Sequence, residues 1–168
     1  MFYKIQSEIL LGSERIFEYR NLFRFAQEIL KNSEYSYHFM RIKLTTLFVD
    51  DQGKALKFYT EILGFVKKSD VTAYNFRWLT VVSPEELDGT QLQLAPNNNP
   101  SAKIYQESIF KQGIPAAMFF VDDVQKEYQR LANLGVKFTK EPTKTPGSTI
   151  VVLDDTCGNL IQLTQLGQ

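Results

Sequence analysis

Few residues in this chain have the types and spacing that chemistry needs. The single histidine, His38, and the single cysteine, Cys157, lie far apart in the sequence. One histidine cannot supply a site that needs two imidazole ligands. Cys157 has acidic sequence neighbours and no nearby cation to lower its pKa, which favours a turn residue over a nucleophile. The sequence therefore offers no visible nucleophile, histidine base or metal-ligand set.

Two pairs of acids could be mistaken for catalytic carboxylates. Asp50-Asp51 and Asp122-Asp123 each stand at the start of a predicted helix. A carboxylate at that position accepts hydrogen bonds from free backbone N–H groups and meets the positive end of the helix dipole. We therefore predict that these pairs cap helices.

Four further polar or aromatic positions keep two interpretations open. Arg77 and Trp78 are neighbours in a predicted strand, so only one of them can face a given side. Trp78 could form an aromatic floor and Arg77 an anion anchor, or they could be a core aromatic and a solvated arginine. Gln93 and Gln162 could bind ligand through amides that need hydrogen-bond partners, or they could be ordinary strand residues.

The elements that must position these residues come from a duplication. The tetrapeptide Phe-Val-Asp-Asp occurs at 48–51 and again at 120–123. Each copy is followed by a helical pattern that ends at a glycine, Gly64 or Gly135, and then by a short apolar run with lysines. Two copies are fewer than the roughly three repeats that a solenoid needs. We therefore expect a closed pair of modules with a shared site between the halves.

Both modules read as strand, helix and three strands. In the first, about 40–96, we predict a strand at 42–49, a helix at 52–63, and strands at 65–68, 76–83 and 90–94. The second, about 114–166, has a predicted strand at 116–121, a helix at 124–134, and strands at 136–139, 149–153 and 160–163. A linker helix at 102–111 joins them.

Residues 1–39 stand outside the repeat. From Ser13, apolar residues recur in steps of three and four, which predicts an amphipathic helix. Met40 could itself begin a protein. The segment is therefore either a real N-terminal helical extension or lies upstream of the native start at Met40, and the domain proper is 40–168.

Bulk composition narrows the class of protein. The chain has 168 residues, 43% of them hydrophobic, and its 19 basic and 19 acidic residues cancel. That is enough for one well-packed domain, and no basic face points to nucleic acid or to an anionic membrane. No apolar run approaches the roughly 20 residues of a membrane helix, and the start lacks a signal peptide's apolar core. We expect a cytoplasmic protein.

The motifs, taken in order, resemble the vicinal oxygen chelate superfamily, which contains glyoxalase I, bleomycin-resistance proteins and extradiol dioxygenases. The carrying segments are 49–51, 58–59 with 63–65, 121–123 with 134–136, and 154–163. The resemblance covers about Met40 to Leu166. It implies an α+β fold in which two βαβββ modules form curved mixed sheets around a cleft. It does not fix a reaction, because this fold hosts many.

The resemblance also implies where a metal would sit. Catalytic members hold a divalent ion with four side chains, usually His or Gln on the first strand of each module and Glu on the last. The matching positions are Leu44, Gln93, Ala116 and Gln162. Two of these cannot coordinate a metal, and neutral amides are weak ligands. We therefore predict a member with neither metal nor cofactor.

The same positions define the predicted ligand cleft. Thr46 and Met118 lie two residues along on the same strand faces, and Trp78 is the likelier inward member of its pair. The predicted lining is Leu44, Thr46, Trp78, Gln93, Ala116, Met118 and Gln162. Such a lining suits a partly apolar organic molecule held by a few hydrogen bonds.

Two functions remain open at this point, with a third less favoured. The first is a metal-free small-molecule-binding protein that sequesters an organic compound. The second is a lyase, isomerase or dioxygenase-like enzyme with atypical active-site residues. The third is a partner-binding module that uses the 1–39 helix.

The resemblance also implies a homodimer, which would close exposed sheet edges. No acidic cluster stands out in the sequence, so the identity of the ligand is not predicted.

Overall fold

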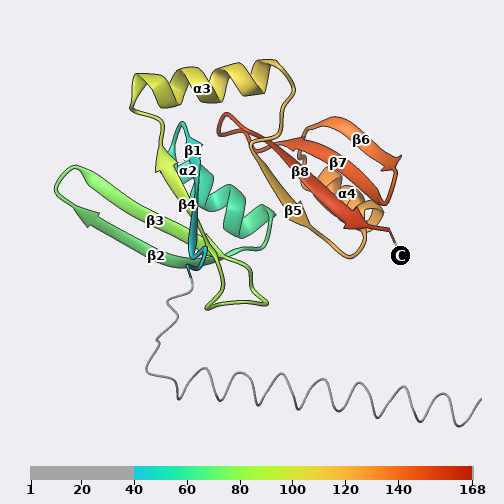
Figure 1. Cartoon of the computed structure of the whole chain (residues 1–168), viewed down its shortest axis with the longest axis horizontal. Helices are drawn as coiled ribbons and strands as arrows, with labels where there is room; N and C mark the ends of the chain where they lie inside the picture. Colours follow the sequence, from blue (N-terminus) through green and yellow to red (C-terminus); the bar gives the residue numbers. More distant parts are fainter. Residues whose placement is uncertain (1–39, 168) are drawn as a thin grey trace, which may run out of the picture. The chain divides into compact units, whose positions relative to one another are not determined.

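The computed structural model describes residues 40–167, and the predicted extension at 1–39 lies outside them. From Ile42 onward the chain forms one compact unit. As predicted, its fold is α+β, with two βαβββ modules that each contain a mixed four-stranded sheet (Figure 1). In the part of the chain that the structure describes, no helix is long and apolar enough to cross a membrane.

Module one contains β1 (Leu44–Val49), α2 (Gln52–Lys57), η1 (Phe58–Ile62), β2 (Val66–Ala73), β3 (Phe76–Val82) and β4 (Gln91–Pro96). The strand order is β1-β4-β3-β2. β1 runs parallel to β4, and the other neighbours are antiparallel. Asp51 caps α2 by accepting the backbone N–H groups of Gly53 and Lys54, which confirms the helix-cap prediction for this member of the pair.

Module two repeats this plan. It contains β5 (Ala117–Phe120), α4 (Val124–Asn133), β6 (Phe138–Thr145), β7 (Ser148–Asp154) and β8 (Leu160–Leu166), in the order β5-β8-β7-β6. β5 is parallel to β8, as β1 is to β4. Asp123 caps α4 by accepting the N–H of Lys126. The two sheets therefore place their first and last strands side by side in the same way.

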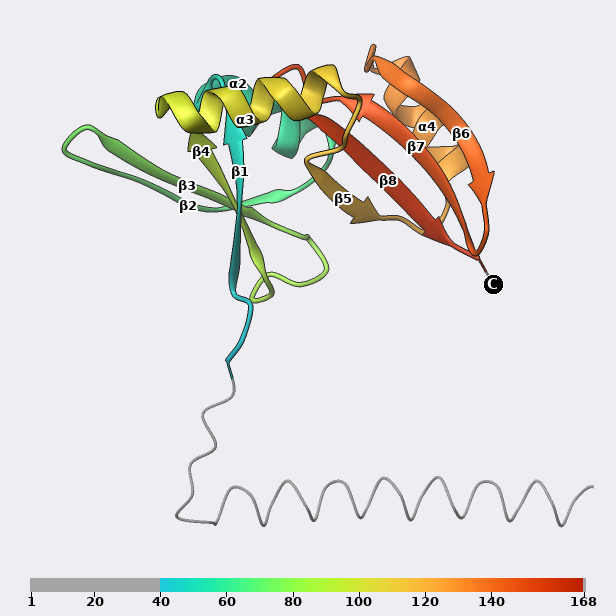
Figure 2. The ribbon, with the colours of Figure 1, turned by 45° about the horizontal axis from the view of Figure 1, so that its top comes forward.

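The linker helix α3 (Pro100–Lys111) begins two residues earlier than predicted, because Asn99 caps it and Pro100 occupies its first turn. Figures 1 and 2 show α3 running past one end of β1 and β4 before the chain enters module two. Its buried Gln106 is the point at which the helix is bound to both modules.

One hydrophobic core runs through both modules. Its buried residues come from the helix-covered faces of the two sheets and from the helices themselves. Tyr59, Phe65 and Phe119 bridge the modules, since the ring centroids of Phe65 and Phe119 lie 5.0 Å apart and those of Tyr59 and Phe119 lie 6.5 Å apart. Two aromatic residues that follow the first Val-Asp-Asp motif and one that precedes the second therefore join the halves.

β2 and β6 run furthest beyond their predicted ends. β2 continues past residue 68 through Ser69-Asp70 and turns only at Tyr74, whose φ is +54°. Asp70 is held in the strand by Arg77 across the hairpin, at 2.8 Å. β6 extends through Pro142, because it is an edge strand and its register shifts between Lys140 and Thr143.

Candidate functional site

The first half of the predicted cleft lies on one face of the module-one sheet. Leu92 and Leu94 of β4 point into the core. Their neighbour Gln93 therefore faces the opposite side, which we call open face A. Register places Thr46 beside Gln93, and Leu44 lies two residues along on the same face. Trp78 of β3 also lies on open face A, because Thr80 pairs with Gln93 and lies two residues from Trp78 on the same strand.

The second half lies on the corresponding face of the module-two sheet. Ile161 and Leu163 of β8 belong to the core. Gln162 between them faces away from it, on what we call open face B. Met118 is paired with Gln162 in register. Six of the seven predicted residues thus lie on the two equivalent faces, and Ala116, one residue before β5, packs partly against the hydrophobic core.

The two glutamines offer complementary hydrogen-bonding groups. Gln93 is only 8% exposed, and its Oε1 accepts the hydroxyl of Thr46 at 2.9 Å. No buried side-chain nitrogen or oxygen lacks a partner in the described residues, so the Gln93 amide nitrogen reaches solvent. Gln162 instead uses its amide nitrogen on the Thr164 hydroxyl at 3.0 Å, which leaves its carbonyl oxygen to accept. Face A therefore presents a donor and face B an acceptor.

Apolar side chains surround these amides without being covered. Trp78 is 38% exposed and Met118 is 51% exposed. Within residues 40–167, no hydrogen bond or strand pairing joins face A to face B. Within one chain, the two predicted linings therefore lie on separate sheets that share no strand pairing.

A buried polar junction, rather than a catalytic centre, connects the modules. The carboxylate of Asp155 accepts the Tyr59 hydroxyl at 2.9 Å, the backbone N–H of Cys157 at 2.7 Å, and the side-chain and backbone N–H groups of Asn159 at 2.8 and 2.9 Å. Burial raises the pKa of the Asp155 carboxyl above its usual value, while these hydrogen bonds act in the opposite direction. Every oxygen lone pair that a substrate would need is already engaged in holding the fold.

Cys157 belongs to the same junction. Its side chain is fully buried, and burial, followed by the nearby Asp155 carboxylate, raises the pKa of its thiol to about 12. A thiol with that pKa is protonated at neutral pH and is a poor nucleophile. The prediction that Cys157 is a turn residue without reactivity is consistent with this environment.

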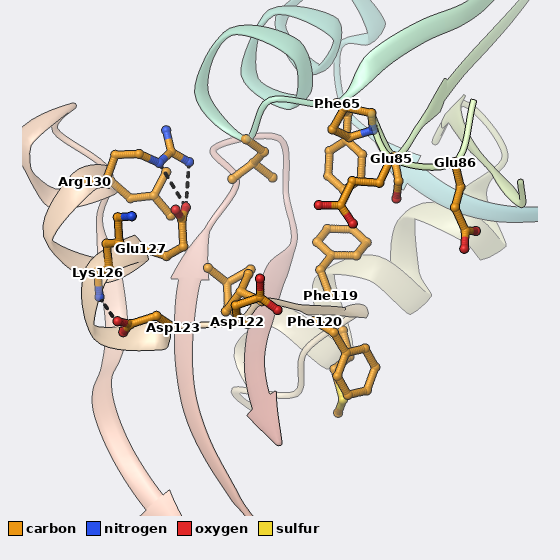
Figure 3. Close-up of a pocket in the computed structure, with 17 residues that line it drawn as sticks. Phe65, Glu85, Glu86, Phe119, Phe120, Asp122, Asp123, Lys126, Glu127 and Arg130 are labelled. Carbon is orange, nitrogen blue, oxygen red and sulfur yellow. Dashed lines mark hydrogen bonds and ion pairs between the residues drawn. The ribbon is translucent and has the colours of Figure 1, made fainter. Parts of the chain in front are cut away.

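The structure also contains a cavity that the sequence did not predict. It has a volume of about 760 Å³ and lies between the loop after β3 and the β5–α4 segment (Figure 3). Of the seven predicted cleft residues, only Met118 lines it. Its acids come from both modules, so sequence proximity gave no signal for it. The one available clue was Asp122, the member of its acidic pair that does not cap the helix.

Comparison with known proteins identifies the family to which this architecture belongs. Residues 41–163 match the model of the Glyoxalase/Bleomycin resistance protein/Dioxygenase superfamily. The chain belongs to this superfamily. It is 60% identical over 126 residues to the uncharacterized protein YurT of Bacillus subtilis (strain 168), covering 75% of this chain and 99% of YurT. The resemblance inferred from the repeated motifs is therefore confirmed.

Two solved structures illustrate what the chain is similar to. UcmS2 is 33% identical with a TM-score of 0.67, covering 75% of this chain and 98% of its own. TnmS3, an antibiotic binding protein from Streptomyces sp. CB03234, is 28% identical with a TM-score of 0.63, covering 77% and 98%. Both alignments span nearly the whole of the related protein.

The residues at the superfamily's metal position do not fit a divalent ion. Leu44 and Ala116 have no donor atom, and the Gln93 carbonyl oxygen is taken by Thr46. Only the carbonyl of Gln162 remains, and a single neutral oxygen cannot replace the several ligands that such ions require. In the described residues, no group of three or more His, Cys, Asp and Glu side chains could hold a metal elsewhere.

Proposed function

We propose that this protein is a metal-free small-molecule-binding protein that uses open faces A and B to hold an organic compound. One observation carries the proposal. The two last strands present amides, Gln93 and Gln162, at equivalent positions and among exposed apolar side chains, where a metal centre would need charged or imidazole ligands. Apolar walls with a few placed polar groups are typical of sites for organic ligands.

The two amides restrict the ligand's chemistry. The free N–H of Gln93 needs an acceptor, and the free carbonyl of Gln162 needs a donor. Trp78 and Leu44 provide a flat and an aliphatic contact for an apolar body. The favoured ligand is thus a partly apolar molecule with both a hydrogen-bond acceptor and a donor, rather than a small anion.

We infer that two copies of the chain close the cleft. β1 and β5 each lie at the edge of their sheet, so both first strands have an unpaired side. Faces A and B of one chain are not joined to each other, and each leaves large apolar side chains uncovered. A homodimer in which face A of one protomer opposes face B of its partner would cover both.

The similarity to TnmS3, an antibiotic binding protein, supports a binding role.

A thermal-shift screen of organic compounds tests this function. A compound at about 100 times its Kd should stabilise the protein by about 2.7 kcal/mol. Ala116→Trp should fill the cleft and abolish the shift while the fold is retained. Gln162→Leu should weaken a polar ligand by about 1–3 kcal/mol, because the ligand's donor loses its partner.

Matched substitutions on the exposed side of α4 serve as controls. Ala132→Trp and Gln129→Leu make the same changes at exposed positions outside both open faces. They should leave the ligand's affinity unchanged. Equal binding by Ala116→Trp and Ala132→Trp would place the site elsewhere, and catalytic turnover of the ligand would replace sequestration by an enzymatic function.

A further inference from the structure

The unpredicted cavity between the modules has an apolar wall. The rings of Phe65 and Phe119 meet edge to face with centroids 5.0 Å apart, which fixes both rings. Met118 and Phe120 are 51% and 63% exposed, although each is a large apolar side chain. Figure 3 shows Phe65, Phe119 and Phe120 following one another along one side of the cavity. Its volume of about 760 Å³ lies in the range of sites that enclose organic molecules.

Uncompensated negative charge lies next to these rings, where Figure 3 shows Glu85 beside Phe65 and Phe119. Glu85 and Glu86 come from the loop after β3, and Asp122 precedes α4. Among residues 40–167, the carboxylates of these three acids accept no hydrogen bond and form no ion pair. The Lys126 ammonium is the one lining cation that is likewise unpaired in this part of the chain. With Asp123, Glu127 and Arg130 included, the lining has five acids and two cations, an excess of three negative charges.

The other charged lining residues are already engaged. Arg130 donates to Glu127 at 2.8 and 2.9 Å and to the carbonyl of Ile62 at 3.0 Å. Asp123 accepts the backbone N–H of Lys126 as the cap of α4. The contact with Ile62 ties the last turn of α4 to module one, and the Glu127–Arg130 pair is neutral as a unit, whereas Asp123 keeps its negative charge.

We propose that this cavity binds a hydrophobic organic cation, with its apolar body against the phenylalanines and its positive charge facing Glu85, Glu86 and Asp122. Aromatic faces attract cations through the ring quadrupole, and carboxylates add a direct Coulomb attraction. An anion at the start of α4 is disfavoured, because Asp122 and Asp123 stand where it would bind. This site shares only Met118 with the proposed cleft, and it does not depend on that cleft.

Two ions of the same shape and opposite charge provide the test. Tetraphenylphosphonium and tetraphenylborate should be titrated calorimetrically into the full-length protein. We expect the cation to bind at least tenfold more tightly than the anion. Raising the NaCl concentration should weaken the cation's binding, since salt screens exposed carboxylates. Equal or tighter binding of tetraphenylborate would overturn the proposal.

Substitutions locate the bound cation. The triple variant Glu85→Gln, Glu86→Gln, Asp122→Asn should weaken tetraphenylphosphonium at least tenfold, whereas Glu141→Gln, an exposed acid outside the cavity, should not. Phe120→Ala should weaken it severalfold, and Tyr105→Ala, an exposed aromatic on α3, should not.

The result also separates the two sites. All altered side chains in these variants are exposed, and unchanged melting temperatures will confirm that they fold. If Ala116→Trp abolishes cation binding while the triple variant and Phe120→Ala leave it intact, the probe lies in the cleft and the cavity proposal is wrong. If instead the triple variant and Phe120→Ala weaken cation binding and Ala116→Trp does not, the cation binds in the cavity. The cleft is then tested separately by the thermal-shift screen.

Discussion

At the scale of single residues, the best-satisfied polar groups of this protein hold it together and the least satisfied ones face solvent. Asp155 is fully buried and accepts four hydrogen bonds, from groups on both modules. Gln93 and Gln162 keep one functional group each unengaged by protein. A buried carboxylate is tolerated only when such partners replace water. Removing one partner should therefore be costly.

Replacing Tyr59 by phenylalanine tests this cost. The Tyr59 ring is fully buried, and its hydroxyl donates to Asp155 across the module junction. Tyr59→Phe should lower the free energy of unfolding by about 1–3 kcal/mol, because a buried carboxylate loses a donor. Urea unfolding at neutral pH measures the effect. Tyr74→Phe removes a hydroxyl from a fully exposed side chain and should change stability little; equal effects of the two would contradict the role of the junction.

The pH dependence of that loss has a definite sign. Burial raises the folded-state pKa of Asp155, and the Tyr59 hydrogen bond lowers it. The folded state therefore holds the Asp155 proton more tightly than the unfolded chain, so this group's stabilising contribution is present at acid pH and is lost as pH rises through the folded pKa. Tyr59→Phe raises that pKa further. Its destabilisation should consequently be largest at neutral pH and shrink as the carboxyl becomes protonated.

Some of this residue-scale detail was accessible from sequence. Asp51 and Asp123 were predicted as helix caps, because a helix start leaves backbone N–H groups that need a local acceptor. The role of Asp155 was not predicted, since its partner Tyr59 lies 96 residues away in the sequence. A pattern of neighbouring residues carries no information about such a distant partner.

At the scale of elements, periodicity predicted which segments are helices and strands but not all their limits. β2 passes through Ser69-Asp70 because the cross-strand pair with Arg77 favours extended backbone there. The helix predicted at 52–63 is α-helical as far as Lys57 and continues as the π-helix η1 from Phe58. The backbone N–H of Leu63 donates to the carbonyl of Phe58. The first departure depends on a contact with another strand, whereas the second is a local change in the helix's own hydrogen bonding.

The turn before β8 depends on a single glycine. Gly158 has φ +95°, and a Cβ there would lie 2.8 Å from the amide nitrogen of Gln106 on α3. Gly147 has φ +79° but open space around it. Gly147→Ala should cost about 1–2 kcal/mol of stability from backbone strain alone. Gly158→Ala should cost about 1–3 kcal/mol more, because the contact with Gln106 adds overpacking. Equal losses of stability for the two variants in urea unfolding would show that Gln106 moves aside without cost, which would contradict the predicted overpacking.

At the scale of the whole molecule, the duplicated motif predicted two equivalent sheets but not how their faces meet. The repeat places Gln93 and Gln162 at corresponding points of β4 and β8, as expected from the internal symmetry. How the modules pack depends on the Asp155 junction and on Phe65 against Phe119, which no repeat encodes. The cavity follows from that packing, because its acids belong to different modules.

Mixed dimers can decide whether the cleft is shared between chains. Leu44→Trp should block face A and Ala116→Trp face B, so each pure variant should bind no ligand from the screen. If face A of one protomer opposes face B of its partner, a mixed dimer has one cleft that is blocked on both faces. Its other cleft is formed by the two unaltered faces and is intact. Equimolar variants, unfolded and refolded together, should then form about half mixed dimers and recover about a quarter of the wild-type binding capacity. Light scattering should report twice the chain mass throughout. A monomeric mass, or no recovered capacity, would contradict a cleft built from two chains.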